Sequence, residues 1–281
     1  MSSSSRHPCE FISCLRAFVP SCLIWTTVLV SFLPIGLNAA AQEKKVLVYT
    51  RQAKTIDGKP GFIHNNTKAA VEMIRKLGAD SGFAVDVSED PAVFTEANLK
   101  QYKVLVFSNT NNQIFDTEDQ QAALQKYIRG GGGFVGIHSA TGSMRAWPWF
   151  CSMIGGRFQR HPKLQPFTIK VVDHKNPSTS FLGGTWKWED EFYYHQNLAA
   201  DNHILLAGDL STLTDKDKPQ TADNTFPLAW CREFEGARIW YTALGHKPEY
   251  YSDPDFQKHI LGGILWAMEG NAETKEPAGA K

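Results

Sequence analysis

The sequence predicts an α/β domain with a mostly parallel central sheet flanked by helices. Short apolar runs at 45–49, 103–107 and 133–137 are bounded by polar residues or glycine, which is typical of central strands covered on both faces. Helical patterns alternate with the strands, and this alternation indicates right-handed crossover connections within one parallel sheet. The second half of the chain is less regular, and it predicts an added hairpin and an irregular, aromatic-rich insertion.

After the first strand, the chain is predicted to form a helix, a strand and a second, shorter helix. Asn66 or Thr67 can cap the first of these helices. Its buried face is predicted from apolar residues that recur at helical spacing: Ala70, Ile74 and Leu77. A strand follows at 84–87, and the short helix begins at Thr95 and ends near Tyr102.

Another helix is predicted between the strands at 103–107 and 133–137. Thr117 followed by Gln120 forms a capping-box pattern. The side chains predicted to face the core are Ala122, Leu124, Tyr127 and Ile128. The helix is predicted to end at Gly130, because a run of four glycines tolerates left-handed backbone.

The second half carries four further segments with strand character: 167–172, 204–206, 227–231 and 238–242. Glu235 and Gly236 separate the last two segments and form a good hairpin turn. The aromatic-rich insertion is centred on 186–194. A final amphipathic helix is predicted from Asp253, which can cap it, to Met268.

Residues 1–41 are predicted to be an export signal. Arg6 and Arg16 precede an apolar stretch at 18–37, which ends in three alanines before Gln42. A retained membrane anchor is the alternative, because the stretch approaches the roughly 20 apolar residues that span a bilayer. Two prolines and the alanine-rich exit favour cleavage. The mature chain is therefore expected in the periplasm or outside the cell, without stable insertion in the membrane.

The mature chain is predicted to comprise one domain, 42–270, and a small, polar, disordered tail, 271–281. The sequence has 29 basic and 29 acidic residues, and the leader holds two of the basic and one of the acidic residues. The mature chain therefore has 27 basic and 28 acidic residues and a net charge near −1. This balance gives no field that would attract nucleic acid or an anionic membrane. Cys151 and Cys231 are the cysteines beyond the leader, and they are interpreted as small hydrophobic residues rather than a disulfide.

Histidines follow the predicted parallel strands where ligands bind, beyond their carboxyl ends. His64 lies in the long loop at 50–66, and loops of that length are usually functional. His138 occupies the tip of a small-X-tip-X-small pattern, the signature of a nucleophile elbow. Histidine can act there as a base, an acid or a metal ligand, and Ser139 is a fallback nucleophile. The alternative is an ordinary strand end with a hydrogen-bonded histidine.

Further polar residues extend the candidate site. His246 follows the strand at 238–242, and Glu249 lies nearby, as a base and its orienting acid do in a catalytic triad. Glu191 and Tyr193 belong to an acidic and aromatic segment that suits a sugar site, although a solvated charge run is the alternative for its acidic residues. His259 is interpreted as a helix-face histidine outside the site.

Taken together, four segments resemble the trehalose-utilisation (ThuA-like) family from residue 45 to about 270. The segments are Phe62-Ile63-His64-Asn65, the glycine-rich run 131–138, Gly155-Gly156-Arg157-Phe158 with His161-Pro162, and 241–246 running on to 261–266. The resemblance implies a variant of the class I glutamine amidotransferase fold, which is flavodoxin-like. His138 stands where that fold carries its cysteine, and His246 lies near its histidine. Glutaminase activity is excluded, because the required thiolate is missing.

The resemblance also implies a small carbohydrate substrate, either a disaccharide or an oxidised 3-keto-sugar. The resulting hypothesis is an enzyme of carbohydrate metabolism that acts by hydrolysis, elimination or isomerisation. Its catalytic residues would be His138, His246 and Glu191. Its substrate-binding residues would be His64, His161, Arg157 and Tyr193.

Neutral imidazoles with one carboxylate form a ligand set that zinc and similar divalent ions accept. The candidate metal ligands are His64, His138, His161 and His246. Acid and base catalysis by a histidine and Glu191 without a metal is the alternative. No nucleotide cofactor is expected. A non-catalytic carbohydrate-binding protein and a scaffold with a vestigial cleft are the rival functions.

Overall fold

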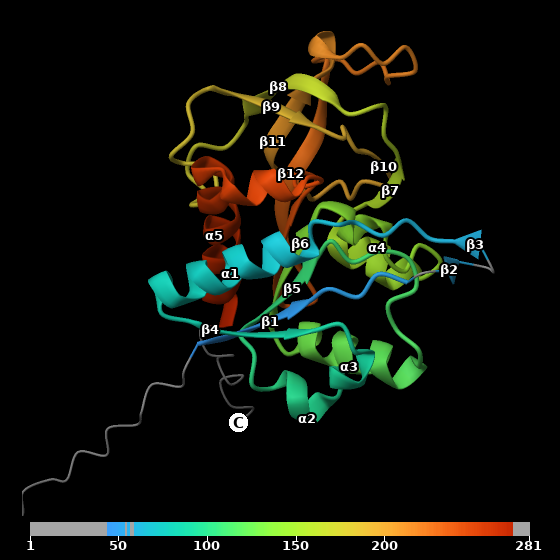
Figure 1. The fold of residues 1–281 in the computed structure, drawn as a ribbon, viewed down its shortest axis with the longest axis vertical. Coiled ribbons are helices and arrows are strands. Elements are labelled where there is room, and N and C mark those ends of the chain that lie inside the picture. Colours follow the sequence, from blue (N-terminus) through green and yellow to red (C-terminus); the bar gives the residue numbers. More distant parts are fainter. Residues whose placement is uncertain (1–43, 54, 57–58, 272–281) are drawn as a thin grey trace, which may run out of the picture. The chain divides into compact units, whose positions relative to one another are not determined.

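A nine-stranded mixed sheet runs through the part of the chain that the computed structural model describes, residues 44–53, 55–56 and 59–271 (Figure 1). The predicted export signal and residues 272–281 of the predicted tail lie outside these residues. In sheet order the strands are β4 (Ala84–Ser88), β1 (Lys45–Tyr49), β5 (Val104–Ser108), β6 (Gly133–Ile137), β13 (Ala237–Thr242), β12 (Thr225–Phe234), β11 (His203–Asp209), β8 (Gln165–Val171) and β9 (Thr185–Asp190).

The sheet has a parallel half and an antiparallel half. Strands β4, β1, β5, β6 and β13 pair in parallel, and their order is that of a flavodoxin-like fold. The strands from β13 to β9 pair antiparallel. The predicted fold class is confirmed. Because the five parallel strands run the same way, the segments that follow β1, β5, β6 and β13 all leave the same edge of the sheet.

Helices cover both faces of the parallel half. In Figure 1, α1 and α5 lie on one side of β1, β5 and β6, and α2, α3 and α4 lie on the other. The bounds of the helices are α1 (Thr67–Ser81), α2 (Glu96–Leu99), α3 (Glu118–Arg129), α4 (Pro148–Ile154) and α5 (Pro254–Met268). Strands β5 and β6 are buried along their whole length, in agreement with their apolar composition.

Short elements complete the described chain. They are the strands β2 (Thr55–Ile56), β3 (Lys59–Pro60), β7 (Arg157–Arg160) and β10 (Tyr194–Gln196), and the 3-10 turns at Pro91–Val93, His138–Gly142, Leu210–Thr212, Pro248–Ser252 and Glu269–Asn271. Strands β7 and β10 form an antiparallel pair apart from the main sheet. Among the described residues, no helix is long and apolar enough to cross a bilayer. Cys151 and Cys231 are both free thiols.

The capping residues behave as predicted for three helices. Thr95 caps α2, and Thr117 forms a capping box with Gln120 at the start of α3. Asp253 accepts hydrogen bonds from two backbone N–H groups at the start of α5. Asn66 differs, because it occupies the cap position of α1 while its side chain makes no hydrogen bond to the helix backbone. Its side chain is used elsewhere, as described below.

Two details of α3 differ from the prediction. Gly130 ends the helix with a φ of −80°, and the left-handed residue is the next glycine, Gly131, with a φ of 82°. Ala122 is exposed, and the buried side chain at this turn belongs to Ala123. One residue changes the direction on the helix by about 100°, so Ala123, four residues before Tyr127, lies towards the buried face while Ala122 points away from it.

The predicted hairpin is formed by β12 and β13. Glu235 and Gly236 have φ angles of 47° and 91°. Two consecutive residues at positive φ are typical of the tight turn whose twist matches that of the flanking strands. The aromatic-rich insertion is also present, and its first part is regular. In β9, Trp188 and Asp190 are buried while Glu189 between them is exposed, which is the alternation of a half-buried strand.

Gly262 lies where α5 packs against the segment that follows β8. A Cβ atom there would lie 2.4 Å from Cα of Ser178 and 2.5 Å from the backbone of Pro177. We expect Gly262→Ala to lower the free energy of unfolding by about 1–3 kcal/mol, because neither backbone can move without disturbing the core. Urea unfolding measures the change. Gly183→Ala, at a site with open space around the Cβ position, is the control and is expected to be neutral.

His259 in α5 makes folding stability depend on pH. Burial lowers the pKa of His259 to about 4, although a hydrogen bond to the carbonyl of Ser178 opposes the shift. The unfolded chain binds the proton near pH 6.5, so the stability contributed by neutral His259 is complete above that pH and is lost as the pH falls towards 4. Between pH 7 and pH 5, His259 is expected to account for about 2 kcal/mol of the folding stability that wild type loses. His259→Gln should not show this part of the loss.

Urea unfolding at the two pH values tests this expectation. His174→Gln, at an exposed position, is the matched control and should keep the wild-type pH dependence. An unchanged slope in His259→Gln would contradict the assignment.

Candidate functional site

Three histidines and a glutamate converge beyond the carboxyl edge of the parallel strands. His64 comes from the loop between β1 and α1, His138 follows β6, His246 follows β13, and Glu191 follows β9. Each offers one ligand atom, and these four atoms all lie within 4.8 Å of one another. We call these residues the His/Glu group. Segments as far apart as residues 64 and 246 thus meet at one place.

His138 forms the centre of the group and sits on a strained turn. Its φ is 53°, and its side chain is fully buried. A residue other than glycine is held at such a φ only when its surroundings enforce it. Nδ1 donates to the carbonyl of Ala243 at 2.8 Å, and Tyr241 Oη donates to the carbonyl of His138 at 2.7 Å. The elbow predicted from the sequence is therefore present, with Nε2 left to face the group.

Nε2 of His138 has three polar neighbours. Tyr193 Oη lies 2.9 Å away, Nδ1 of His246 lies 3.3 Å away, and Oε2 of Glu191 lies 3.6 Å away. Burial, aided by the nearby His64, lowers the pKa of His138 well below its usual value. The ring is therefore neutral, and its Nε2 lone pair is available to a proton donor or a cation.

His64 is positioned by Gln52. Oε1 of Gln52 accepts from the backbone N–H of His64 at 2.7 Å and lies 3.1 Å from its Nδ1. An Nδ1–H that donates to this oxygen leaves Nε2 without the proton. Burial, together with the charge of His246, lowers the pKa of His64 to about 4. His64 is thus a second neutral imidazole.

His246 and Glu191 form a charge pair at the open side of the group. Nδ1 of His246 lies 3.2 Å from Oε2 of Glu191. Burial disfavours the charged imidazole, but the hydrogen bond and the charge of Glu191 outweigh it and raise the pKa of His246. Burial likewise opposes the charged carboxylate, while His246 and the other histidines lower the pKa of Glu191. Glu249, the orienting acid suggested by the sequence, is exposed, and Glu191 contacts His246 in its place.

Asp190 holds the loop of His246, and sequence reasoning did not single it out. Its fully buried carboxylate accepts from the backbone N–H of Gly245 at 2.8 Å and of His246 at 3.3 Å. It also accepts from the N–H of Glu191 at 2.8 Å and from Nε1 of Trp188 at 3.0 Å. Burial raises the pKa of Asp190 to about 6 against the effect of these donors. The alternation of β9, with Asp190 on the face of Trp188, is the signal that could have found it.

Asn66 ties the same loop to the start of α1. Its Nδ2 donates to the carbonyls of Gly245 at 2.7 Å and of His246 at 2.9 Å, and to Oδ1 of Asn109 at 2.9 Å. This is why Asn66 makes no cap for α1. Tyr251 Oη also donates to the carbonyl of Gly245, at 2.9 Å. An asparagine before a helix predicts a cap, so no local pattern would have indicated this role.

The other predicted site residues lie at different distances from the group. Nε2 of His161 lies 3.5 Å from Oε1 of Glu191, on the other side of that carboxylate, and His161 is outside the set of four. Tyr193 contacts His138, as described above. Arg157 donates to the carbonyl of Arg145 at 3.3 Å, and no contact joins it to the group in the described chain. Oγ of Ser139 lies 3.4 Å from Nδ1 of His64.

Most aromatic side chains of the insertion belong to the core. Phe192 is fully buried, and Tyr193, Tyr194 and Trp188 are nearly so. Their rings pack on one another and on Phe226, as in the contact of Tyr194 with Phe226 at 5.3 Å between ring centres. The sequence hypothesis that rings of this segment stack on a sugar is therefore not supported by their position.

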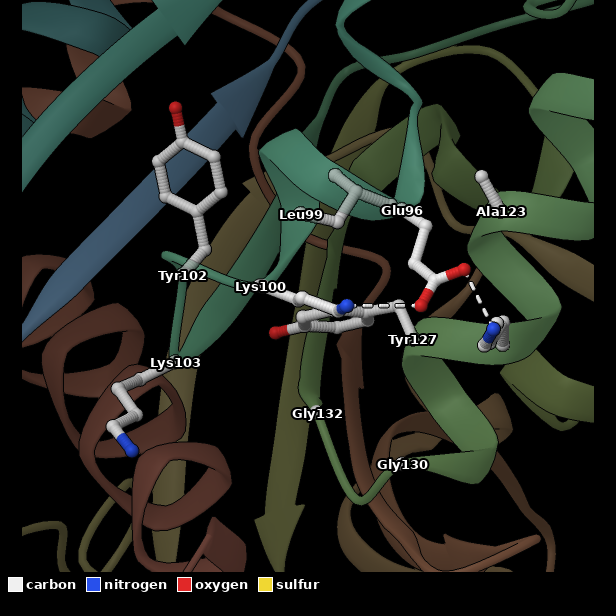
Figure 2. A pocket seen from close by; sticks show the side chains of 10 residues that line it. Glu96, Leu99, Lys100, Tyr102, Lys103, Ala123, Tyr127, Gly130 and Gly132 are labelled. Carbon is white, nitrogen blue, oxygen red and sulfur yellow. Dashed lines mark hydrogen bonds and ion pairs between the residues drawn. The ribbon is translucent and has the colours of Figure 1, made fainter.

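A pocket of about 300 Å³ lies elsewhere, between α2 and α3 at the opposite edge of the sheet (Figure 2). Its polar groups are mostly paired with one another. Glu96 bonds Lys100 at 3.0 Å and Lys126 at 2.6 Å, and Tyr127 Oη donates to the carbonyl of Gly133. The His/Glu group, where side chains with shifted pKa values converge, is therefore the candidate functional site.

Comparisons with known proteins agree with the fold and identify the family. The chain matches solved ThuA-like proteins from Bacteroides uniformis (24% identity, 82% of this chain and 93% of that chain, TM-score 0.66) and Parabacteroides merdae (20% identity, 83% and 93%, TM-score 0.64). A cytoplasmic protein from Salmonella typhimurium also matches (14% identity, 79% and 98%, TM-score 0.55). The comparison with curated proteins finds no match. The family model described as ThuA, trehalose utilisation, matches residues 45–267, and the chain therefore belongs to the ThuA family.

Proposed function

We propose that this protein is an exported, metal-dependent enzyme that acts on a disaccharide or a 3-keto-sugar. The observation that carries the proposal is the convergence of His64, His138, Glu191 and His246 within 4.8 Å. The predicted leader supports export, and membership of a family named for trehalose utilisation supports a carbohydrate substrate. Zinc or a similar divalent ion is the proposed cofactor.

The spacing of three of the four ligand atoms fits a tetrahedral ion. A tetrahedral zinc ion with bonds of about 2.0–2.2 Å keeps its ligand atoms roughly 3.3–3.6 Å apart. The three distances among Nε2 of His138, Nδ1 of His246 and Oε2 of Glu191 are 3.3, 3.2 and 3.6 Å. The donor set of three imidazoles and one carboxylate is also one that zinc accepts.

The surrounding residues prepare the histidines for this role. Metal-binding histidines commonly donate their second N–H to a carbonyl or carboxylate, which fixes the tautomer. His138 does so towards Ala243, and His64 does so towards Gln52. The lowered pKa values of His138 and His64 keep both rings neutral, as ligands must be.

A bound divalent ion would supply Lewis acidity, which polarises a sugar carbonyl or activates water. The chain's own residues would bind and move protons around it. Glu191 contacts His161 through Oε1, the oxygen that is not its ligand atom, so it can accept a proton from His161 or pass one to it. Tyr193 Oη contacts Nε2 of His138. It can instead donate a hydrogen bond to a substrate oxygen that takes the place of this contact. These roles suit hydrolysis, elimination or isomerisation.

Two measurements test the proposal. Elemental analysis of the purified protein, with a thermal shift that a chelator reverses, tests the metal. A screen of oxidised and unoxidised disaccharides against wild type and His138→Ala tests turnover. Turnover by wild type that His138→Ala abolishes supports the enzyme. Binding of sugars without turnover, unchanged in His138→Ala, would overturn it in favour of a carbohydrate-binding protein.

A further inference from the structure

Phe62 places an exposed aromatic ring beside the His/Glu group. It exposes 60% of its surface and Ile63 exposes 46%, although both lie in the loop that carries His64. Among the described residues, Val172 is the other large hydrophobic residue with comparable exposure. A phenylalanine left largely in water forgoes most of the free energy that burial of its ring would contribute. Burial in the core therefore does not account for a phenylalanine at this place.

The backbone around Phe62 is firmly anchored. Nδ2 of Asn111 donates to the carbonyl of Phe62 at 3.4 Å, and Oε1 of Gln52 accepts from the N–H of His64 at 2.7 Å. Gly61 approaches the facing chain so closely that a Cβ atom would lie 2.6 Å from a backbone oxygen. Contacts on both sides thus fix the backbone that carries the ring of Phe62.

The ring lies on the side from which a ligand reaches the His/Glu group. His138 is fully buried, whereas the side chains of His246 and His161 are 21% and 36% exposed. Phe62 lies nearly parallel to the ring of His246, at 6.2 Å between ring centres and an angle of 24°. It also meets the ring of His64 at 4.7 Å, edge to face. A ligand that enters beside His246 therefore meets the ring of Phe62.

We propose that Phe62 is the platform on which the apolar face of a pyranose ring stacks, while the polar groups of the sugar face the His/Glu group. The proposal rests on the proposed function and names the residue that selects its substrate class. A pyranose has a face of C–H groups that packs on an aromatic ring, and its hydroxyls need polar partners at its edge. Phe62 supplies the aromatic ring, and the His/Glu group supplies the polar partners. Phe192 and Tyr194 are buried and cannot contact a sugar.

Calorimetric titration of the zinc-supplemented full chain with trehalose and with 3-ketotrehalose tests the platform. Phe62→Ala is expected to raise the Kd of the sugar that binds wild type about tenfold, because the stacking contact is lost. Phe62→Tyr and Phe62→Trp keep an aromatic face and should stay within about threefold of wild type. Zinc affinity should be unchanged in all three, because Phe62 supplies no ligand atom.

Val172→Ala is the matched control, since Val172 is 54% exposed and comes directly after β8 rather than from the loop of His64. It should leave the sugar Kd unchanged. Equal affinity of wild type and Phe62→Ala, with zinc and sugar both bound, would overturn the platform and leave the proposed function intact. If wild type binds neither sugar, the proposed substrate class and the platform fall together.

Discussion

Replacing His138 with alanine is expected to weaken zinc binding by more than about 100-fold. His138 places Nε2 3.3 Å from Nδ1 of His246 and 3.6 Å from Oε2 of Glu191, so its loss opens a gap at the centre of the ligand set. Groups that only orient a ligand contribute about 10- to 100-fold to metal affinity, and a direct ligand contributes more. Competition with a chelating dye measures the affinity, and elemental analysis measures the zinc content.

A control separates loss of a ligand from loss of the fold. His174→Ala removes an exposed histidine and should bind zinc as wild type does. Circular dichroism and thermal unfolding in the presence of a chelator show whether His138→Ala is folded without metal. A folded His138→Ala protein that keeps one zinc per chain at wild-type affinity would rule out His138 as a ligand.

Asp190→Ala is expected to lower the free energy of unfolding by about 4 kcal/mol and to weaken zinc binding as well. The substitution leaves three backbone N–H groups and the indole N–H of Trp188 without their acceptor in a buried place. Each unsatisfied donor costs about 1–3 kcal/mol, and water entering the gap recovers part of that. Because Gly245 and His246 lose their anchor, zinc affinity should also fall about 10- to 100-fold.

Glu189→Ala is the matched control for Asp190→Ala. Glu189 is the preceding residue, its side chain is half exposed, and it pairs with Lys247 at 2.7 Å. Exposed pairs of this kind contribute up to about 1 kcal/mol, so Glu189→Ala should be nearly neutral. Urea unfolding and zinc titration of both variants give the comparison. Equal stability of the two variants would show that Asp190 does not hold the loop of His246.

The elements of the parallel half could be predicted because their signals are local. The runs that became β1, β5 and β6 are apolar on both faces, and such runs occur where helices cover a sheet on both sides. Thr117 with Gln120, and Glu235 with Gly236, act through hydrogen bonds and backbone angles within a few residues. Signals of this kind can be read before the rest of the fold is known.

Part of the His/Glu group could also be predicted, for a related reason. His138 and His246 directly follow parallel strands, and His64 lies in the loop after another, so the strand direction alone sends them to one edge of the sheet. The small residues around His138 indicated the turn that holds it at a φ of 53°. The spacing of these residues along the sequence could not show which of their side-chain atoms contact one another. The distances between those atoms depend on the register of neighbouring strands.

Tertiary structure alone decided the partners that come from the antiparallel half and the loops. Glu191 rather than Glu249 contacts His246, Asp190 anchors the same loop, and Asn66 bonds that loop instead of its own helix. Phe62 is exposed beside the group while the aromatic rings of the insertion are buried. The amino-acid sequence determined the sheet and the edge at which the histidines lie, because periodicity and strand direction are local properties. Which carboxylate and which ring join them depends on how distant segments fold over that edge, and hydrogen bonds across long sequence separations leave no local pattern.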